Sequence, residues 1–419
     1  MTVCVIDGVQ SVQGVAADGD VPRAGLAIAA DGSYAARLTL GNGPFDGAAW
    51  FPERWTLDGP EPYAVPLPLN QPEEPGTDVL PLADGRVLIH RRVAERQAFS
   101  LLYPTGPGTG ELPLGAVECP ELTLLPPSPD GTSAYALAPG DGGTTVWLVA
   151  GGAFGPEPVA TVRGRCTGGV WLDRTGRLLT VDRELDGVVK AVAVDLERGG
   201  EVSPLLQIAE GSNDRLLLAD ADSGLLLIRS DAPGRDLLGW GVLGSARPVR
   251  FPECLRPAGR VVTPFAVQPG QVLMPESCAV ALRIDGPDGT RVGTWRPSVR
   301  QLREQAPPEG WLTGTGLWSR DGVLQLPYAT GTMPCGVARL GVPREAPRDV
   351  PMDTWHGAAQ NLRPEQNLRP EQNVRPELTT QPAQVEAAGG NGSPRRPTHL
   401  VRKPVPLQQA PLTGRTAPG

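Results

Sequence analysis

The sequence predicts an all-β fold: a seven-bladed β-propeller closed by its N-terminal strand, with a disordered C-terminal tail. Three observations predict it. Glycine and proline account for 53 and 47 of the 419 residues, and helix interiors reject both at this density. Hydrophobic residues make up 40% of the chain, enough to build a core. A turn dipeptide recurs on average every 48 residues or so, a period typical of a four-stranded propeller blade.

The repeat is centred on a glycine that follows aspartate in most copies, as in Asp31-Gly32 and Asp130-Gly131. Glycine supplies the positive φ that a tight hairpin requires, and aspartate bonds to its own backbone. Successive turn glycines are 53, 46, 45, 48, 46 and 52 residues apart. They are Gly32, Gly85, Gly131, Gly176, Gly224, Gly270 and Gly322.

Each turn lies between two apolar runs that have strand chemistry. Such near-continuous runs are typical of strands buried on both faces, as inner blade strands are. The strands expected before the turns are 25–28, 77–80, 122–125, 169–172, 215–218, 260–263 and 315–318. Those expected after them are 86–89, 134–137, 177–180, 225–228, 271–274 and 323–326. Third strands are expected at 99–103, 145–149, 190–194, 238–242 and 279–283, and a more polar fourth strand completes a unit.

The ends of the repeat array indicate how it closes. Seven units cover about residues 16–342, and the last offers only three strands, ending at 335–340. The strand-like segment 2–6 has no unit of its own. We expect it to become the outer strand of the last blade, which removes exposed edges. One helix is expected before the last unit, where 298–301 forms a capping box and Pro307-Pro308 ends the helix.

From about Gly357 the composition changes. No aromatic residue follows Trp355, and such a segment buries too little apolar surface to offset its ordering entropy. We therefore divide the chain into a propeller over 1–350 and a disordered Pro-, Arg- and Gln-rich tail over 357–419. The hexapeptide NLRPEQ and its variants occupy 361–366, 367–372 and 373–378. These repeats are either a docking tail for a folded partner or a spacer.

Charge and cysteine usage limit the partners and the compartment. The net charge is −8, and the eight basic and four acidic residues of 357–419 leave −12 for the preceding part. An acidic body disfavours nucleic acid and favours basic protein surfaces or cations. No run of 18 apolar residues occurs, so no membrane insertion is expected. The six cysteines include no C-x-x-C pair and no basic, apolar leader is present, which predicts reduced, mostly buried thiols and a cytoplasmic protein.

One copy of the turn carries a family resemblance. Ser128-Pro-Asp-Gly131, followed by TSAYAL, resembles the S-P-D-G strand–turn–strand motif of TolB-type and other WD40-like β-propellers. Weaker copies are 30–32, 172–176 and 319–322. The resemblance extends as a pattern over about 330 residues. It implies the fold and no particular chemistry, because propellers include binding platforms and several classes of enzyme.

Signatures of catalysis are mostly missing from the sequence. Neither G-x-S-x-G nor a phosphate-binding G-x-x-x-x-G-K-[ST] is present. The histidines are His90, His356 and His399, so a histidine-rich metal site is not expected. We interpret His90 as a surface or hairpin-end residue. We predict no catalytic residue and leave open whether the chain is an enzyme.

Charged residues recur shortly before the first strand of each unit, where loops of a propeller open onto the central channel. One interpretation is a ring of mainly carboxylate side chains at the channel mouth, able to hold a cation or a basic peptide. The other is that these are ordinary solvated loops of an acidic protein. The residues concerned are Asp20, Glu74, Glu118, Arg165, Asp214, Glu253 and Glu309.

These observations favour a non-catalytic, monomeric scaffold that binds a protein or peptide through its channel face, with no cofactor. Two alternatives remain. One is a metal-dependent propeller hydrolase or lyase, in which the carboxylate ring holds a divalent cation such as calcium. The other is a propeller that senses a small ligand. Convergence of three or more of the carboxylates would favour the metal-dependent enzyme.

Overall fold

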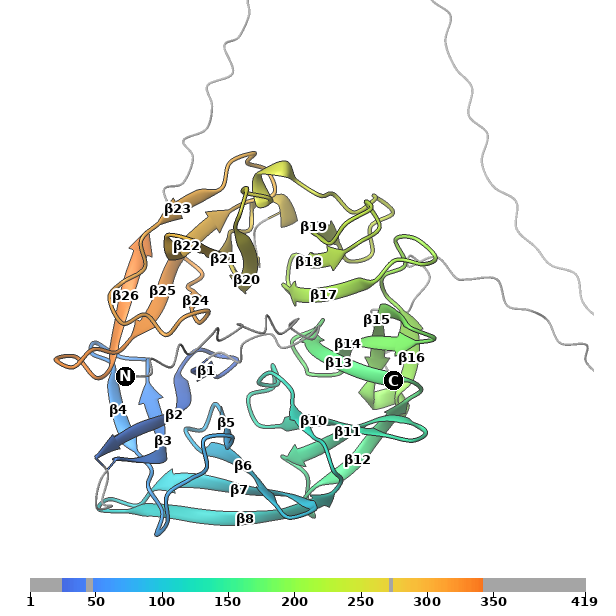
Figure 1. Ribbon diagram of the computed structural model, residues 1–419. Coiled ribbons are helices and arrows are strands. Elements are labelled where there is room, and N and C mark those ends of the chain that lie inside the picture. The colour runs from blue at the N-terminus through green and yellow to red at the C-terminus, as the bar shows by residue number, and fades with distance from the viewer. Residues whose placement is uncertain (1–24, 43–47, 271–273, 342–419) are drawn as a thin grey trace, which may run out of the picture. The chain divides into compact units, whose positions relative to one another are not determined.

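The computed structural model describes residues 25–42, 48–270 and 274–341, and their regular structure is almost entirely β. Strands β1 to β26 form sheets in which neighbouring strands pair antiparallel, apart from one parallel residue pair between β15 and β17. In Figure 1 the sheets follow one another in chain order, and the first strand of a sheet, such as β5, β13 or β17, lies on its inner side. The expected all-β fold of short strands and tight turns is confirmed.

The first three sheets each contain four strands in chain order. The first is β1 (Ala27–Ile28), β2 (Tyr34–Asn42), β3 (Ala48–Thr56) and β4 (Tyr63–Pro66). The second is β5 (Asp78–Pro81), β6 (Val87–Val93), β7 (Arg96–Pro104) and β8 (Thr109–Glu118). The third is β9 (Thr123–Leu124), β10 (Ala134–Gly140), β11 (Gly143–Ala150) and β12 (Glu157–Val162).

The next strands form one seven-stranded sheet, in which two groups meet at a single parallel residue pair, Lys190 with Asp214. The first group is β13 (Arg165–Trp171), β14 (Leu178–Leu185), β15 (Val188–Asp195), the 3-10 turn η1 (Leu196–Arg198) and β16 (Glu201–Pro204). The second group is β17 (Asp214–Ala219), β18 (Leu225–Ser230) and β19 (Leu237–Val242).

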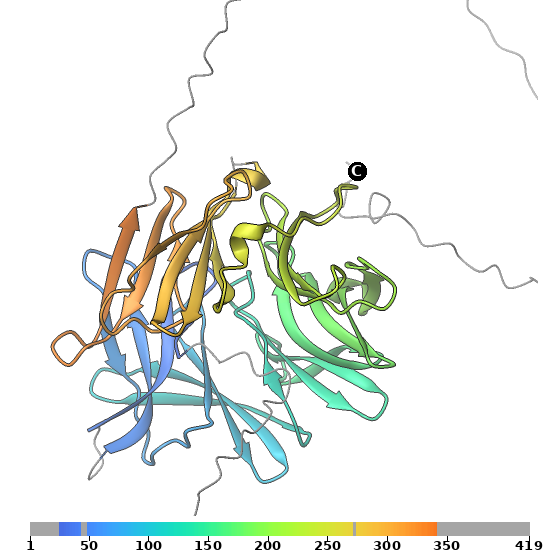
Figure 2. The same ribbon diagram turned by 45° about the horizontal axis from the view of Figure 1, so that its top comes forward.

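Two further sheets follow. One contains β20 (Val261–Val267), β21 (Val280–Gly286), β22 (Gly289–Trp295) and β23 (Arg303–Gln305), with the 3-10 turns η2 (Glu253–Leu255) and η3 (Pro275–Ser277) in its connections. The other contains β24 (Leu317–Trp318), β25 (Val323–Tyr328) and β26 (Gly336–Gly341). In Figure 2 these two sheets, coloured yellow and orange, stand side by side.

The hydrophobic core lies between successive groups of strands. Among the described residues, seven buried clusters each join two neighbouring groups. One example places Leu137 and Val146 of the third sheet against Leu179 and Val194 of the next group. Another packs Leu26, Ala35 and Trp55 of the first sheet with Cys335, which directly precedes β26 of the last. Each strand group is therefore stabilised by the groups on both sides of it.

The turn between the first and second strand of a group packs on the preceding group. Gly131 has a φ of +71°, and a β-carbon there would lie 2.7 Å from the Ala83 β-carbon in the turn of the second sheet. Likewise, a β-carbon on Gly32 would lie 2.7 Å from Leu317 in the last sheet. Close approaches to the preceding group occur at Gly32, Gly85, Gly131, Gly176, Gly270 and Gly322. Glycine leaves room for these contacts, and at all of these positions except Gly270 it also supplies a positive φ.

Most of the predicted hairpins are confirmed. The turn glycines at 32, 85, 131, 176, 224 and 322 have positive φ values, and β-strands flank each of them. The expected third strands correspond to β7, β11, β15, β19 and, with the difference described next, β21. The last sheet has three strands among the described residues, as expected.

The hairpin predicted at Pro269-Gly270 is wrong. Gly270 does not have a positive φ, and its N–H donates to Asp220 Oδ2 of the preceding group at 3.0 Å. The strand β20 pairs with β21, which the spacing assigned to third position. Of the expected partner strand 271–274, the first three residues lie outside the described part of the chain.

The predicted helix near 298–306 is also wrong. Its C-terminal half, Arg303–Gln305, is the strand β23, which pairs with β22. The helix would have had only about nine residues between Pro297 and Pro307, and isolated helices of this length are marginal. Pairing with an open sheet edge therefore outweighs the capping signal.

Several expectations concern residues outside the described part of the chain: the closing strand at 2–6, Asp20, and the tail over 357–419. The boundary between propeller and tail therefore stays a prediction. Within the described ranges, no helix has the length and apolar character needed to cross a membrane.

A glycine that supplies a positive φ and also touches the preceding group should be less replaceable than one that only supplies a positive φ. Two alanine substitutions compare these cases through the free energy of unfolding. Gly187 has a φ of +79° but no atom within 4 Å of its missing β-carbon. Gly187→Ala should therefore cost only backbone strain, about 1–2 kcal/mol. Gly131→Ala adds a clash with Ala83, which raises the loss to about 3–5 kcal/mol in the free energy of unfolding, measured by urea denaturation. Equal losses would show that the turn does not depend on packing.

Candidate functional site

The loops that lead into the first strands define one end of the sheets, here called the entry face. First strands are all followed by antiparallel partners, so these loops and the hairpins between second and third strands lie at the same end. Glu74, Glu253 and Glu309 lie in such loops and are exposed. None of the three forms an ion pair within the described residues. These three glutamates thus lie shortly before first strands, as the sequence pattern predicted.

Two other predicted members are exposed but already paired. Glu118 is the last residue of β8, and its Oε1 lies 2.7 Å from Arg96 Nη2. Arg165 is the first residue of β13 and lies 2.9 Å from Glu121 Oε1. Both ion pairs are largely solvated, and such pairs contribute little to stability.

Among the described residues, the predicted carboxylates are not grouped into a metal site. The members that form ion pairs each pair with a residue outside the set. In the described ranges, no three His, Cys, Asp or Glu side chains are grouped closely enough to hold a metal ion. The geometry that would have favoured a metal-dependent hydrolase or lyase is therefore not found among these residues.

Asp214 differs from the rest of the predicted set. It begins β17, and its residue is 0% exposed, so it cannot belong to a solvent-facing ring. Its carboxylate accepts hydrogen bonds from Ser230 Oγ at 2.6 Å and from the Ile208 N–H at 3.0 Å. Lys190 Nζ lies 2.7 Å from Asp214 Oδ2. Sequence position placed this aspartate at the entry face, but its neighbours make it an internal ion pair.

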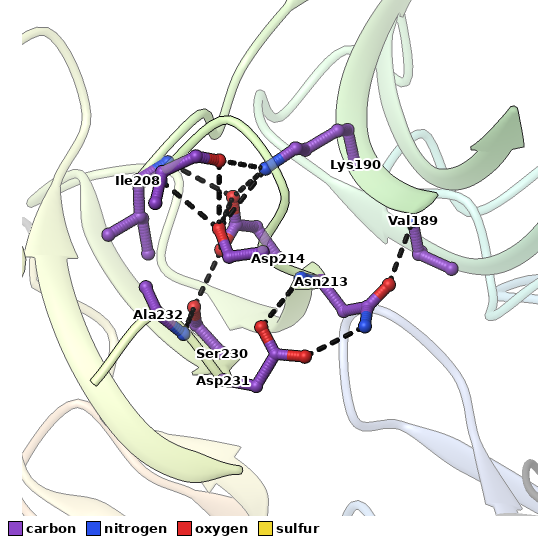
Figure 3. Close-up of polar contacts among 10 residues, drawn as sticks. Val189, Lys190, Ile208, Asn213, Asp214, Ser230, Asp231 and Ala232 are labelled. Atoms are coloured by element: carbon purple, nitrogen blue, oxygen red, sulfur yellow. Dashed lines mark hydrogen bonds and ion pairs between the residues drawn. The ribbon is translucent and has the colours of Figure 1, made fainter. Parts of the chain in front are cut away.

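Lys190 holds this ion pair from the adjacent strand group, as Figure 3 shows. Its ammonium group also donates to the Ala209 carbonyl at 2.5 Å and lies 3.1 Å from Ser212 Oγ. Three oxygens thus converge on one nitrogen. A compact ammonium group directs three donors in this way, whereas a planar guanidinium does not. This explains a lysine here in a chain whose 38 basic residues include only Lys190 and Lys403 as lysines.

The same network fixes the loop that leads into β17. Asn213 donates from its backbone and side-chain nitrogens to the Asp231 carboxylate, each at 2.8 Å. These bonds hold the pKa of Asp231 below its ordinary value. Asn213 Oδ1 accepts the Val189 N–H at 3.0 Å (Figure 3). The loop is therefore fastened to the β14–β15 hairpin on one side and to the β18–β19 hairpin on the other.

A second buried carboxylate lies near the same boundary. Asp182 on β14 accepts the Leu216 N–H of β17 at 3.2 Å, and Arg215 Nη1 stands 3.8 Å away. Burial raises the pKa of Asp182 to about 7, although the Leu216 N–H and Arg215 act in the opposite direction. This group titrates near neutral pH.

The sequence suggested that His90 is a surface or hairpin-end residue, but the structure places it in the interior. It sits within β6 with 7% exposure and stacks on Phe99. Its Nδ1 lies 3.2 Å from Asp78 Oδ2, and its Nε2 lies 2.9 Å from Gln97 Oε1. Both ring nitrogens are therefore occupied by internal partners, and the residue contributes to packing.

The described cysteines are free thiols that are buried or half-buried, as expected for small apolar fillers. Burial raises the pKa of each thiol, that of Cys335 to about 12. The thiolate form, which is the reactive one, is thereby disfavoured. The residues are Cys119, Cys166, Cys254, Cys278 and Cys335.

No protein-family model and no curated protein match the chain. Similar solved structures include TolB from Acinetobacter baumannii, with 12% identity, a TM-score of 0.40, and coverage of 72% of this chain and 76% of that one. The β-propeller domain of the Trilobed protease from Pyrococcus furiosus has 11% identity, a TM-score of 0.46, and coverage of 74% and 92%. Resemblance to TolB-type propellers is thus found at the level of the fold.

Prolyl oligopeptidase B from Galerina marginata is also similar, with 11% identity and a TM-score of 0.44. The match covers 72% of this chain and 45% of that one, so the chain spans about half the length of this relative. Identities and scores of this size carry no information about activity.

Two substitutions test the Lys190 geometry. Lys190→Met leaves the Asp214 carboxylate buried without its cation, and we expect a loss of about 3–5 kcal/mol in the free energy of unfolding. Lys190→Arg keeps the charge but misdirects its donors, which should cost about 1–3 kcal/mol. Urea denaturation measures both, with the exposed Arg235→Met as a control. A Lys190→Arg variant as stable as wild type would contradict the three-oxygen requirement.

The pKa of Asp182 predicts a pH dependence of stability. Between the ordinary value of 3.8 and about 7, the folded chain retains a proton that the unfolded chain has released. Its contribution to stability therefore falls as pH rises through this window. Asp182→Asn can still accept the Leu216 N–H and should remove this part of the slope. Urea unfolding of both proteins across the window measures it, and parallel curves would refute the assignment.

Proposed function

We propose that the chain is a non-catalytic β-propeller that binds a protein or peptide with basic side chains on its entry face. The observation that carries the proposal is the set of exposed glutamates Glu74, Glu253 and Glu309 in loops that lead into first strands. These carboxylates have no cationic partner within the described residues, in contrast to Glu118. They supply an excess of negative charge that attracts a basic surface.

The rigidity of the entry face supports this function. The loop before β17 is held by the ion pair between Lys190 and Asp214 and by the contacts between Asn213 and Asp231. A loop that is already ordered loses little conformational entropy when a partner binds. The polar network therefore contributes to binding without contacting the partner.

We also propose that the strands form seven blades, the last completed by the N-terminal strand. The seven hydrophobic clusters support this count, since one of them links the last sheet to the first. The single residue pair between β15 and β17 is then a boundary between two blades. β26 is the outermost described strand of its sheet, in the position next to which a fourth strand would pair.

The binding surface is tested by removing its unpaired charges. Full-length protein with Glu74→Gln, Glu253→Gln and Glu309→Gln should retain a partner from native extract about tenfold less than wild type, because each exposed carboxylate contributes up to about 1 kcal/mol. Retention is measured by quantitative mass spectrometry at low and high salt.

A matched control removes three exposed glutamates at the opposite end of the sheets. Glu157, Glu197 and Glu201 lie in or beside connections between third and fourth strands. The variant Glu157→Gln, Glu197→Gln, Glu201→Gln should retain partners as wild type does. If both triple variants retain the same partners equally well, the entry face is not the binding surface.

A further inference from the structure

A cavity of about 300 Å³ lies between β19 with the segment that follows it and residues 274–276, which precede β21 of the next group. The segment that follows β19 and the segment that precedes β21 are at the end of the sheets remote from the entry face. The cavity is thus separate from the surface proposed above. The residues used here are Trp240, Val242, Arg247, Arg250, Met274 and Glu276, all of which line it.

The walls are held in place by hydrogen bonds. Trp240 and Arg250 exchange two backbone hydrogen bonds of 2.9 Å each. The Ser245 N–H donates to the Val242 carbonyl at 3.1 Å, and Ser245 Oγ accepts the Arg247 N–H at 3.2 Å. A ligand therefore meets a preformed surface and does not have to order it.

The floor of the cavity is apolar. Trp240 is 4% exposed and belongs to the core cluster between the two groups. Val242 packs against the same cluster. Met274 is 68% exposed, which is unusual for a large apolar side chain and leaves its surface free for contact.

Two arginines and one glutamate line this cavity. The Arg250 guanidinium stacks 5.0 Å from the Trp240 ring centroid and forms no ion pair within the described ranges. Arg247 Nη1 stands 3.8 Å from Glu276 Oε1, too far for a hydrogen bond. An excess of positive charge over an apolar floor contrasts with the net charge of −8 of the chain.

We propose that this cavity binds a small carboxylic acid with an aromatic or aliphatic body. The carboxylate accepts hydrogen bonds from Arg247 and Arg250, and the body packs on Trp240, Val242 and Met274. Charge-assisted hydrogen bonds from guanidinium groups suit a carboxylate geometrically. The volume, equivalent to roughly ten water molecules, accommodates one ring or a short chain.

The chemistry is tested with 3-phenylpropionate and its neutral amide, 3-phenylpropanamide, by isothermal titration calorimetry on the full-length protein. We expect the acid to bind with a Kd of about 1 mM, which is ordinary for a ligand of this size. The amide should bind at least about tenfold more weakly, because it offers no charge to the arginines. Equal binding of the two, or no heat from the acid at millimolar concentration, would overturn the proposal.

The location is tested by charge removal. Arg250→Gln should weaken binding of 3-phenylpropionate about tenfold or more, and Arg247→Gln by a smaller factor. Arg235→Gln, on the exposed β18–β19 hairpin, removes the same charge and should bind as wild type does. Thermal melting of each variant identifies any loss of folding, and Arg247, which does not stack on Trp240, provides the second variant. Binding by both cavity variants equal to that of Arg235→Gln would place the site elsewhere.

Discussion

The close packing of glycine turns on their neighbours is the constraint on which the rest of the fold depends. At Gly131 and Gly176, the turn backbone approaches the preceding group so closely that a β-carbon would lie 2.7 Å and 2.6 Å from its neighbour. First strands lead directly into these turns, so the contacts of the turns set how near successive sheets stand to one another. The hydrophobic clusters between the sheets can then close without voids. The regular recurrence of turn glycines along the sequence therefore corresponds to a similar separation between neighbouring sheets.

The opposite end of the sheets is fastened by charge rather than by shape. There Lys190 crosses between two strand groups to reach Asp214, and Asn213 secures the adjoining loop to Asp231. Side chains bridge the distance between the two strand groups here, so the loops at this end can be longer than the turns whose glycines touch the preceding group. The ends with glycine turns are consequently packed closely on their neighbours, while the other end carries exposed glutamates in the loops that lead into first strands.

Much of the fold could be predicted because turn chemistry and apolar runs are local signals. The failures have physical causes that no local signal reveals. Gly270 is held by Asp220 from a neighbouring group, so its backbone takes a conformation that the dipeptide does not suggest. The capping signal near Ser298 lost to pairing of β23 with β22. At the site, position along the chain located the glutamates, but burial of Asp214 depends on Lys190, which is 24 residues away and whose rarity was the one available clue.

The residue pair that joins β15 to β17 makes this boundary unlike the others. Elsewhere the described groups are separate sheets, but here one parallel residue pair, Lys190 with Asp214, joins one group to the next in a single sheet. A chain cut between other groups leaves each sheet whole. A cut in the loop before β17 would separate strands that belong to one sheet. New termini for circular permutation are therefore better tolerated at the connections between separate sheets than at this boundary. Here both the chain and a backbone pair join strands of the same sheet.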